Sequence, residues 1–252
     1  TPMCILLTHT NVLSAVLEKP APSDNVPVLP TLSLVPCPKH TGPSSSIKPA
    51  ISNIVREYFL SNIPVDEKER SVNENNPIRI GYAGRITKTQ KRLDYLPLIL
   101  EYLENKGADY IFEMAGIGDY FNELSDYIKE NNLNEKVILL GIVDKKQMHD
   151  FWRKQDVYFS CSDWEGHSIS QCEGIAAGAV PVVTDVSGAE DDISDGITGY
   201  IVPVGDWEKL AERLLYLCHN RKTIKDMSDA GMKKMRERNN ESEKNVLEEL
   251  CH

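Results

Sequence analysis

From residue 77 onward, short apolar segments alternate with longer segments that have one apolar face, and this alternation constrains the fold more than any other feature. The short segments are residues 78–83, 110–115, 137–140, 157–160, 180–183 and 200–202. Continuous apolar strands separated by amphipathic helices are typical of a parallel sheet that is covered on both faces. Right-handed crossovers then predict an α/β fold with a doubly wound parallel sheet.

The helices between these strands are predicted from apolar side chains three and four residues apart, which share one helix face. The predicted buried faces are Leu93, Leu96, Ile99, Leu100 and Leu103; Phe121, Leu124 and Ile128; Met148 and Trp152; Ile169, Cys172, Ile175 and Ala176; and Leu210, Leu214 and Leu217. Asp206 is the expected N-cap of the last of these helices, and Gly178 is expected to end the helix before it.

The first 76 residues follow a different pattern. Residues 3–8 form an apolar run that predicts a buried strand. Prolines then recur between residues 20 and 49, which prevents long helices and leaves loops with short strand pieces near residues 26–34. Helical spacing returns in residues 50–61, with Ser52 as the expected N-cap, and the polar residues 66–76 suggest a surface linker.

Two regions follow from this division: a proline-rich N-terminal segment of residues 1–49, and a doubly wound, Rossmann-like domain of residues 50–252. The net charge of −10 argues against general binding to nucleic acids or membrane surfaces, because both need a positive field. The six cysteines show no C-x-x-C spacing, which favours reduced thiols in a cytoplasmic protein. No apolar run approaches the roughly 20 residues that span a bilayer, and we expect no signal peptide.

Ligands of doubly wound sheets bind beyond the carboxyl ends of the strands, where the strand order reverses. The candidate loops are residues 84–91, 116–119, 141–143 and 162–168. Glycine at Gly84, Gly116 and Gly141 permits close backbone approach to a ligand, although each could equally be a simple turn residue. The Gly116-x-Gly118 pair is not a dinucleotide motif, because its third glycine is replaced by Phe121, and no G-x-x-x-x-G-K-[ST] phosphate loop is present.

The segment from Ser162 to Gly188 contains two glutamates, Glu165 and Glu173, separated by seven residues. Between them, residues 166–168 predict a turn that opens a helix. Unpaired backbone N–H groups and the helix dipole favour an anion such as phosphate at such a start. Two carboxylates beside it could hold sugar or ribose hydroxyls; the alternative is a surface helix with two solvated acids.

Arg85 and Lys91 are the best candidate cations for a bound diphosphate, because a planar guanidinium and a point charge together suit its oxygens. The alternative is a solvated basic loop, since Lys88 and Arg92 lie in the same run. We expect His167 to contact a ligand mainly through its backbone. No clustered metal-ligand motif is visible in the sequence, and no Ser-His-Asp or Cys-His arrangement can be assembled.

Residues from about 50 to 220 resemble the C-terminal half of retaining glycosyltransferases of family 4, which have the GT-B fold. The resemblance rests on the E-x7-E motif, the G-x-P-V-V run after it, and a series of segments in the same order. These segments are GYAGRITKTQKRLDYL, FEMAGIGDY, VILLGIV, DVYFSCSDWEGHSISQCEGIAAGAVPVV and DGITGYIVPVGDWEKLAERL.

The resemblance implies roles for particular residues. Arg85 and Lys91 would bind the donor's diphosphate, and Glu165 would lie near the donor sugar. Backbone amides of Gly166, His167, Ser168 and Ile169 would contact the sugar or β-phosphate, and Glu173 would bind the ribose. Gly141, Ile142 and Val143 would flank the base. His9, after a strand similar to a late strand of the family's N-terminal domain, would be the counterpart of a histidine near the donor.

Two departures from the family pattern are present. Gly174 stands where members usually have alanine, which lowers helix stability by about 1 kcal/mol. The residues before the linker are also too few for the acceptor-binding N-terminal domain, so we expect the chain to be inactive alone. Peripheral membrane contact would then belong to the missing part.

The resemblance implies a retaining, metal-independent glycosyltransferase with no cofactor, whose donor substrate is a nucleotide diphosphate sugar. Its acceptor would be a sugar or lipid-linked hydroxyl in polysaccharide or glycoconjugate synthesis. The alternatives are a nucleotide-sugar binding module without turnover and a GT-B-fold sugar epimerase. The E-x7-E spacing together with Arg85 and Lys91 argues against the epimerase.

Overall fold

The computed structural model of the chain describes residues 3–5, 13–18, 31–36, 63–66 and 76–251. The chain divides into two compact units, a smaller one of residues 1–64 with 237–252 and a larger one of residues 65–236. The expected boundary between residues 49 and 50 lies outside the described residues, as do the predicted helix of residues 50–61 and His9. The larger unit contains the predicted alternation of strands and helices.

The elements of the larger unit follow one another as predicted. The strands are β4 (Ile78–Ala83), β5 (Tyr110–Ala115), β6 (Val137–Gly141), β7 (Val157–Ser160), β8 (Val180–Thr184) and β9 (Tyr200–Val202). The helices are the 3-10 helix η1 (Leu93–Tyr95), α2 (Leu96–Asn105), α3 (Phe121–Glu130), α4 (Lys145–Lys154), α5 (Ile169–Ala176), α6 (Ala189–Asp192), α7 (Trp207–His219) and α8 (Arg221–Cys251), of which α8 continues into the smaller unit.

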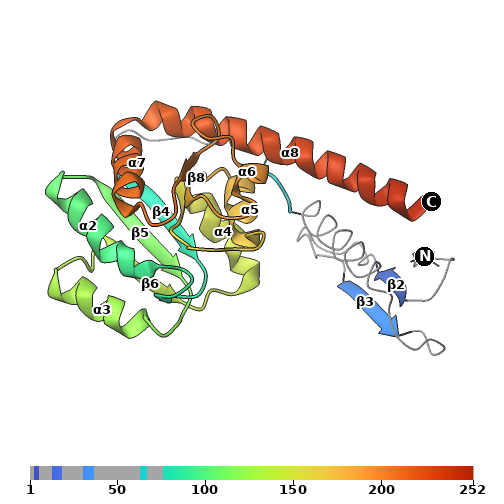
Figure 1. The fold of residues 1–252 in the computed structure, drawn as a ribbon, viewed down its shortest axis with the longest axis horizontal. Coiled ribbons are helices and arrows are strands. Elements are labelled where there is room, and N and C mark those ends of the chain that lie inside the picture. Colours follow the sequence, from blue (N-terminus) through green and yellow to red (C-terminus); the bar gives the residue numbers. More distant parts are fainter. Residues whose placement is uncertain (1–2, 6–12, 19–30, 37–62, 67–75, 252) are drawn as a thin grey trace. The chain divides into compact units, whose positions relative to one another are not determined.

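All six strands of this unit are parallel, in the order β6-β5-β4-β7-β8-β9. The chain first moves from β4 outward to β6 and then returns to the other side of β4 with β7. In Figure 1, α2, α3 and α7 lie on one side of the sheet, and α4 and α5 on the other. This arrangement confirms the doubly wound fold, with its reversal of strand order between β4 and β7.

The core consists of the apolar faces that the spacing predicted, except that Phe121 and Met148 are only half-buried. Leu93, Leu96, Ile99, Leu100 and Leu103 are fully buried, and so are Leu124, Trp152, Leu210, Leu214 and Leu217. Phe112 of β5 and Phe159 of β7 pack edge to face across the sheet, with ring centroids 5.3 Å apart. Asp206 caps α7 as predicted, since its carboxylate accepts a hydrogen bond from the Lys209 amide.

Gly178 terminates helix α5 as predicted, but the first residue of the helix differs from the prediction. Ile169 was expected on its buried face, but this side chain is 55% exposed, because it occupies the first helical position beyond the strand ends. Cys172, Ile175 and Ala176 of the same face are buried as predicted. The helix ends at Ala176, and Gly178 follows it with a φ of 87°, where its carbonyl accepts a hydrogen bond from Ser228 of α8.

In the smaller unit, β1 (Met3–Ile5), β2 (Leu13–Glu18) and β3 (Thr31–Pro36) form an antiparallel sheet. The apolar run of residues 3–8 predicted the first of these strands and the strand pieces near residues 26–34 part of the third, whereas β2 was not predicted.

Asp66 is a fixed point of the larger unit rather than part of a solvated linker. Its backbone N–H donates to the carbonyl of Ala176 at the end of α5, at 2.9 Å. Its carboxylate pairs with Arg153 at 3.0 Å and with His149 at 3.2 Å, both on α4. The start of this unit is therefore tied to two of its helices; residues 67–75 lie outside the described part.

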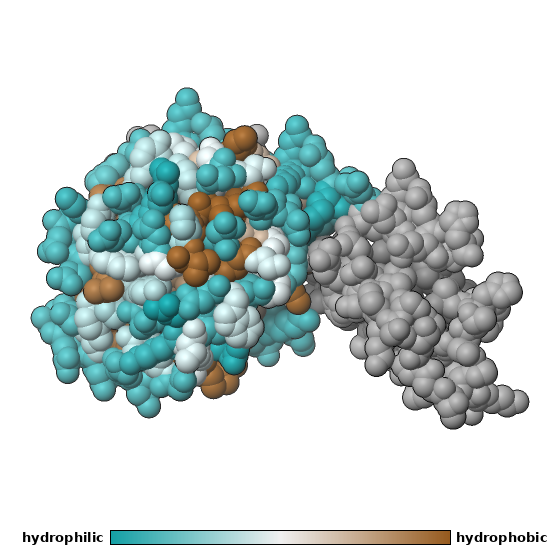
Figure 2. Space-filling view, viewed as in Figure 1, coloured by the Kyte–Doolittle hydropathy of each residue, from teal (hydrophilic) through white to brown (hydrophobic). Residues whose placement is uncertain are grey.

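The face of the larger unit shown in Figure 2 is mostly hydrophilic, with apolar side chains gathered near its middle. The large exposed apolar side chains of the larger unit include Ile117, Ile142 and Trp164, each of which follows the end of a strand. Among the described residues, no helix is both long and apolar enough to cross a membrane.

Candidate active site

The reversal of strand order places the loop after β4 beside the loop after β7. The two strands pair at Ile80 with Val157 and at Gly81 with Tyr158. Beyond them, the Asp163 amide donates to the Gln90 carbonyl at 2.9 Å, and the Gln90 side-chain amide donates to the Trp164 carbonyl at 3.2 Å. The first and fourth candidate loops are thus bonded to each other at the edge where ligands bind in such sheets.

Lys91 and Glu165 form an ion pair between these two loops. Their side chains are only 17% and 12% exposed. The Ser162 hydroxyl donates to the same carboxylate at 2.7 Å, and Thr184 donates to the Ser162 carbonyl at 2.6 Å. Two residues that the sequence singled out separately therefore meet, and the hydroxyl of Ser162 fixes the orientation of Glu165.

Arg85 stands at the surface of the same loop. Its guanidinium donates to the side-chain oxygen of Gln90, and its carbonyl accepts from the Tyr82 hydroxyl at 2.6 Å. Burial raises the pKa of Tyr82 above its usual value, which keeps this phenol protonated as a donor. The Tyr82 hydroxyl therefore holds the backbone of this loop, while the Arg85 guanidinium faces solvent.

The two glycines of the second loop are required because its backbone packs closely against that of the first loop. A Cβ atom at Gly116, where φ is 144°, would lie 1.8 Å from the Gly84 carbonyl oxygen. One at Gly118 would lie 2.1 Å from the Ile86 carbonyl oxygen. The Gly84 amide donates to Ala115 and the Ile86 amide to Ile117, both at 3.0 Å. These glycines allow the β5 loop to support the loop that presents Arg85.

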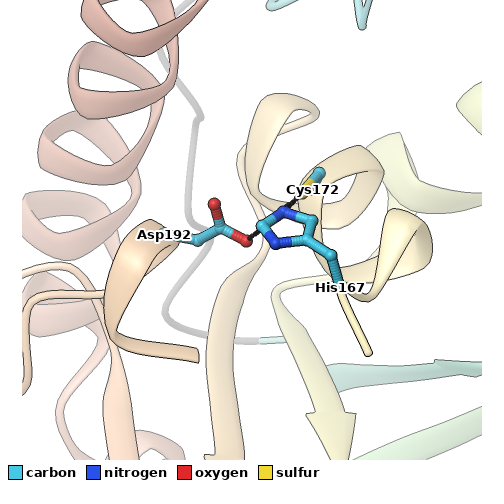
Figure 3. A group of neighbouring side chains, drawn as sticks. All are labelled: His167, Cys172 and Asp192. Atoms are coloured by element: carbon cyan, nitrogen blue, oxygen red, sulfur yellow. Dashed lines mark hydrogen bonds and ion pairs between the residues drawn. The ribbon is translucent and has the colours of Figure 1, made fainter. Parts of the chain in front are cut away.

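The start of α5 presents its backbone outward. Ser168 is its N-cap and accepts a hydrogen bond from the Gln171 amide at 3.4 Å. Gly166 is exposed, and no atom lies within 4 Å of a Cβ atom placed there. The His167 ring instead points inward to Cys172 and Asp192 (Figure 3), so only its backbone is available at this surface.

Glu173 lies one helical turn further along α5 and is half-buried. Burial raises the pKa of this carboxyl above its usual value, and the positive charges of Lys145 and His149 and the nearby Trp152 indole, all on α4, oppose the rise. The Trp152 indole N–H is buried and forms no hydrogen bond within the described part of the chain. Glu173 therefore faces a partly buried region that offers both cations and a free N–H donor.

The loop after β6 contains the last predicted group. Gly141 has a φ of 67°, which only glycine adopts readily, and its carbonyl accepts from the Gly116 amide at 2.7 Å. Ile142 is 78% exposed, and Val143 is half-buried. This loop adds an exposed apolar side chain at the same sheet edge, next to the loop after β5.

Sequence reasoning missed three residues of this region. Gln90 connects the two central loops, Ser162 orients Glu165 within the loop after β7, and Asp192 of α6 holds His167, with Nε2 and Oδ2 3.3 Å apart. The position of Gln90 next to Lys91 was a sequence signal for its contact with the loop after β7. No signal in the sequence connects Asp192 with His167, because they lie on separate crossovers. The chemical roles predicted for the individual site residues stay predictions.

Comparison with known proteins identifies the larger unit. Residues 65–234 match the family model described as glycosyl transferases group 1. The capsular polysaccharide biosynthesis glycosyltransferase CapM of Staphylococcus aureus is 27% identical over 196 residues, which cover 77% of this chain and 50% of that protein. The chain spans half or less of the length of the curated relatives it matches.

Two solved structures show the same fold. The pneumococcal O-GlcNAc transferase GtfA in complex with UDP and GlcNAc has a TM-score of 0.60 at 20% identity, covering 75% of this chain and 38% of that one. The C-terminal domain of a glycosyl transferase group 1 protein, LpcC of Francisella tularensis, has a TM-score of 0.58 at 21% identity, covering 68% of this chain and 93% of that one. The six-stranded parallel sheet matches the Rossmann-like half of GT-B glycosyltransferases. Because the family model matches well over half of its residues, this chain belongs to the glycosyl transferases of group 1.

Proposed function

We propose that the larger unit is the donor-binding half of a retaining glycosyltransferase that transfers a sugar from a nucleotide diphosphate sugar to an acceptor hydroxyl. The observation that carries the proposal is the junction of the loops after β4 and β7, where the Lys91–Glu165 pair lies beside the start of α5. The UDP and GlcNAc bound to GtfA and the role of CapM in capsular polysaccharide synthesis support the substrate class.

The proposed chemistry is electrostatic. Departure of the nucleotide leaves negative charge on its diphosphate. Arg85, Lys91 and the backbone N–H groups at the start of α5 would stabilise this charge, as fixed donors do in an oxyanion hole. A diphosphate that pairs with the Lys91 ammonium would break the Lys91–Glu165 ion pair. The Glu165 carboxylate could then face the sugar. Ser162 would then keep Glu165 oriented, and Glu165 would support positive charge that develops on the sugar ring.

Transfer, hydrolysis and epimerisation of a labelled donor distinguish this function from its two alternatives. A panel of nucleotide diphosphate sugars is screened first by thermal shift, because a bound ligand raises the unfolding temperature by mass action. The best donor, labelled in its sugar, is then incubated with candidate sugar or lipid-linked acceptors. We expect transfer with retention and without an added metal or cofactor. Donor binding without turnover, by a chain as long as its relatives, would support a binding module instead.

Replacing Glu173 by glutamine should weaken binding of the free nucleotide diphosphate about 10- to 100-fold. A hydrogen bond from a ribose hydroxyl to a carboxylate contributes roughly 1.5–3 kcal/mol. Calorimetric titration measures this change. Glu130→Gln, at an exposed position of α3, removes the same charge away from the site and should leave the affinity unchanged. Equal affinities for the two variants would exclude the ribose role of Glu173.

Replacing Arg85 by alanine should weaken diphosphate binding and reduce its dependence on salt, because one exposed cation no longer faces the ligand. Lys88→Ala is the matched control: it removes the same charge from the same loop, where Lys88 pairs with Glu123 at 2.7 Å. Titrations at two or more salt concentrations compare the variants. A salt dependence that falls equally in both would mean that Arg85 acts only through the general field of the loop.

A further inference from the structure

A cluster of three potential metal ligands lies behind the start of α5. His167 Nε2 and Cys172 Sγ are 3.3 Å apart, Cys172 Sγ and Asp192 Oδ2 are 3.2 Å apart, and His167 Nε2 and Asp192 Oδ2 are 3.3 Å apart. Figure 3 shows the histidine ring turned toward both partners, with Cys172 on α5 and Asp192 on α6. The three ligand atoms therefore form a nearly equilateral triangle, although the sequence showed no clustered ligand motif.

This arrangement is not a nucleophilic triad. In a Cys-His-Asp triad the acid contacts one ring nitrogen and the nucleophile the other, so that the histidine can pass a proton. Here Cys172 and Asp192 both face Nε2. Cys172 is also fully buried, so a substrate has no access to its sulfur. The cluster must be explained in another way.

Hydrogen bonding alone explains the cluster incompletely. Oδ2 of Asp192 is approached by the His167 ring, the Cys172 thiol and also the Gln171 amide, the last at 3.0 Å. One carboxylate oxygen would thus have to serve three donors. The other ring nitrogen of His167, Nδ1, is buried and has no hydrogen-bond partner among the described residues. Among the described residues, the ring is therefore held only by its contacts at Nε2.

The triangle has the dimensions of one face of a tetrahedral zinc site. With bonds of about 2.0 Å to nitrogen and oxygen and about 2.3 Å to sulfur, the ligand atoms of such a site lie roughly 3.3–3.5 Å apart. We propose that His167, Cys172 and Asp192 bind a zinc ion through Nε2, Sγ and Oδ2. The ligand types suit this metal, which binds imidazole nitrogen, thiolate sulfur and carboxylate oxygen.

Binding would change the protons of the cluster in a defined way. Zn²⁺ would displace the thiol proton of Cys172 to solvent and leave a thiolate. It would bind neutral His167 at Nε2, so that the ring proton moves to Nδ1. The two positive charges of the ion would match the thiolate and the carboxylate. The Gln171 amide would continue to donate to Oδ2, since ligating carboxylates are themselves commonly hydrogen-bonded.

The position of the site indicates a structural role. The side chain of Asp192 is fully buried and that of His167 is 11% exposed, so the ion would be closed off from a substrate. It would join residue 167, between Gly166 and Ser168 of the candidate donor loop, to α6 on the next crossover. A bound ion would therefore hold the start of α5 in the conformation that presents its backbone N–H groups.

Titration of the reduced, metal-free protein with Co²⁺ tests the site. Co²⁺ occupies zinc sites, and a thiolate ligand gives it a charge-transfer absorption band. We expect one equivalent of Co²⁺ to produce this band and Zn²⁺ to abolish it. The band should be lost in Cys172→Ser and reduced at least 10-fold in apparent affinity in Asp192→Asn. It should persist in Cys218→Ser, which alters a buried thiol of α7 outside the cluster.

Unfolding temperatures provide the second measurement, because the Cys172→Ser protein must be shown to fold. Zn²⁺ should raise the unfolding temperature of the unaltered protein and of Cys218→Ser, and leave that of Cys172→Ser unchanged. Absence of the Co²⁺ band in the unaltered protein would overturn the proposal. A band of equal strength in Cys172→Ser would also overturn it, since the metal would then occupy other thiols. Neither result bears on donor binding, so the proposed function is tested separately.

Discussion

Alanine at position 116 is expected to lower the free energy of unfolding by about 3–5 kcal/mol, because backbone strain and overpacking act together there. The added Cβ atom would lie 1.8 Å from the Gly84 carbonyl oxygen and 2.9 Å from its carbon. Neither is the end of a flexible side chain, so the β4 and β5 loops must move apart. The φ of 144° is also strained for any residue with a side chain. Denaturant unfolding followed by circular dichroism measures the change.

Gly107→Ala separates the two contributions. Gly107 has a φ of 64°, but no atom lies within 4 Å of a Cβ atom placed there. Alanine at this position should therefore cost only about 1 kcal/mol, from the left-handed conformation. Similar losses of unfolding free energy in the two variants would show that the loop after β4 can move away from the added Cβ atom at little cost. A much larger loss in Gly116→Ala, with weaker nucleotide binding, would show that this packing positions Arg85.

Replacing Lys91 by alanine should lower the free energy of unfolding by about 3 kcal/mol, because it leaves the Glu165 carboxylate mostly buried without its cation. It should also weaken diphosphate binding more than Arg85→Ala does. The second substitution Glu165→Leu, which removes the buried charge, should restore most of the stability but none of the binding. Denaturant unfolding and calorimetric titration of the single and double variants measure both effects.

The ion pair between Lys136 and Glu104 is a suitable reference for this prediction. Its atoms are 2.6 Å apart, and its side chains are 38% and 35% exposed. Lys136→Ala should cost less than about 1 kcal/mol, as is usual for exposed pairs. If Lys91→Ala is no more destabilising than Lys136→Ala, the Lys91–Glu165 pair is screened by water and does not hold the two loops together.

The elements that could be predicted from the sequence are those with local signals. The bounds of β4, β5, β7 and β9 match the predicted segments, because each is a short, mainly apolar run that ends at a glycine, a proline or a polar residue. The helices were predicted from their apolar faces, and Asp206 from its capping position. The sequence also predicted that the loops of Lys91 and Glu165 lie at one edge of the sheet, although it did not predict that the two side chains pair.

The features that the sequence could not predict depend on contacts between distant segments. Asp66 looks like a linker residue until α4 and α5 surround it. Asp192 becomes a partner of His167 only when two crossovers pack together. Gly116 has the sequence signature of a ligand loop, but the carbonyl of Gly84 explains why it must be glycine. The exposure of Ile169 depends on where the sheet ends, which apolar spacing does not reveal.

The short pairing between β4 and β7 has a consequence for how this domain tolerates change. These two strands pair at two positions, whereas β4 and β5 pair at six. Much of the connection between the two halves of the sheet therefore passes through the loops above them, by way of Gln90, Lys91 and Glu165. The residues proposed to recognise the donor also join the halves of the domain. Substitutions at this junction that alter the choice of donor will thus change the stability of the domain as well. New donor specificity is therefore most readily gained at the outer loops, such as the one containing Ile142.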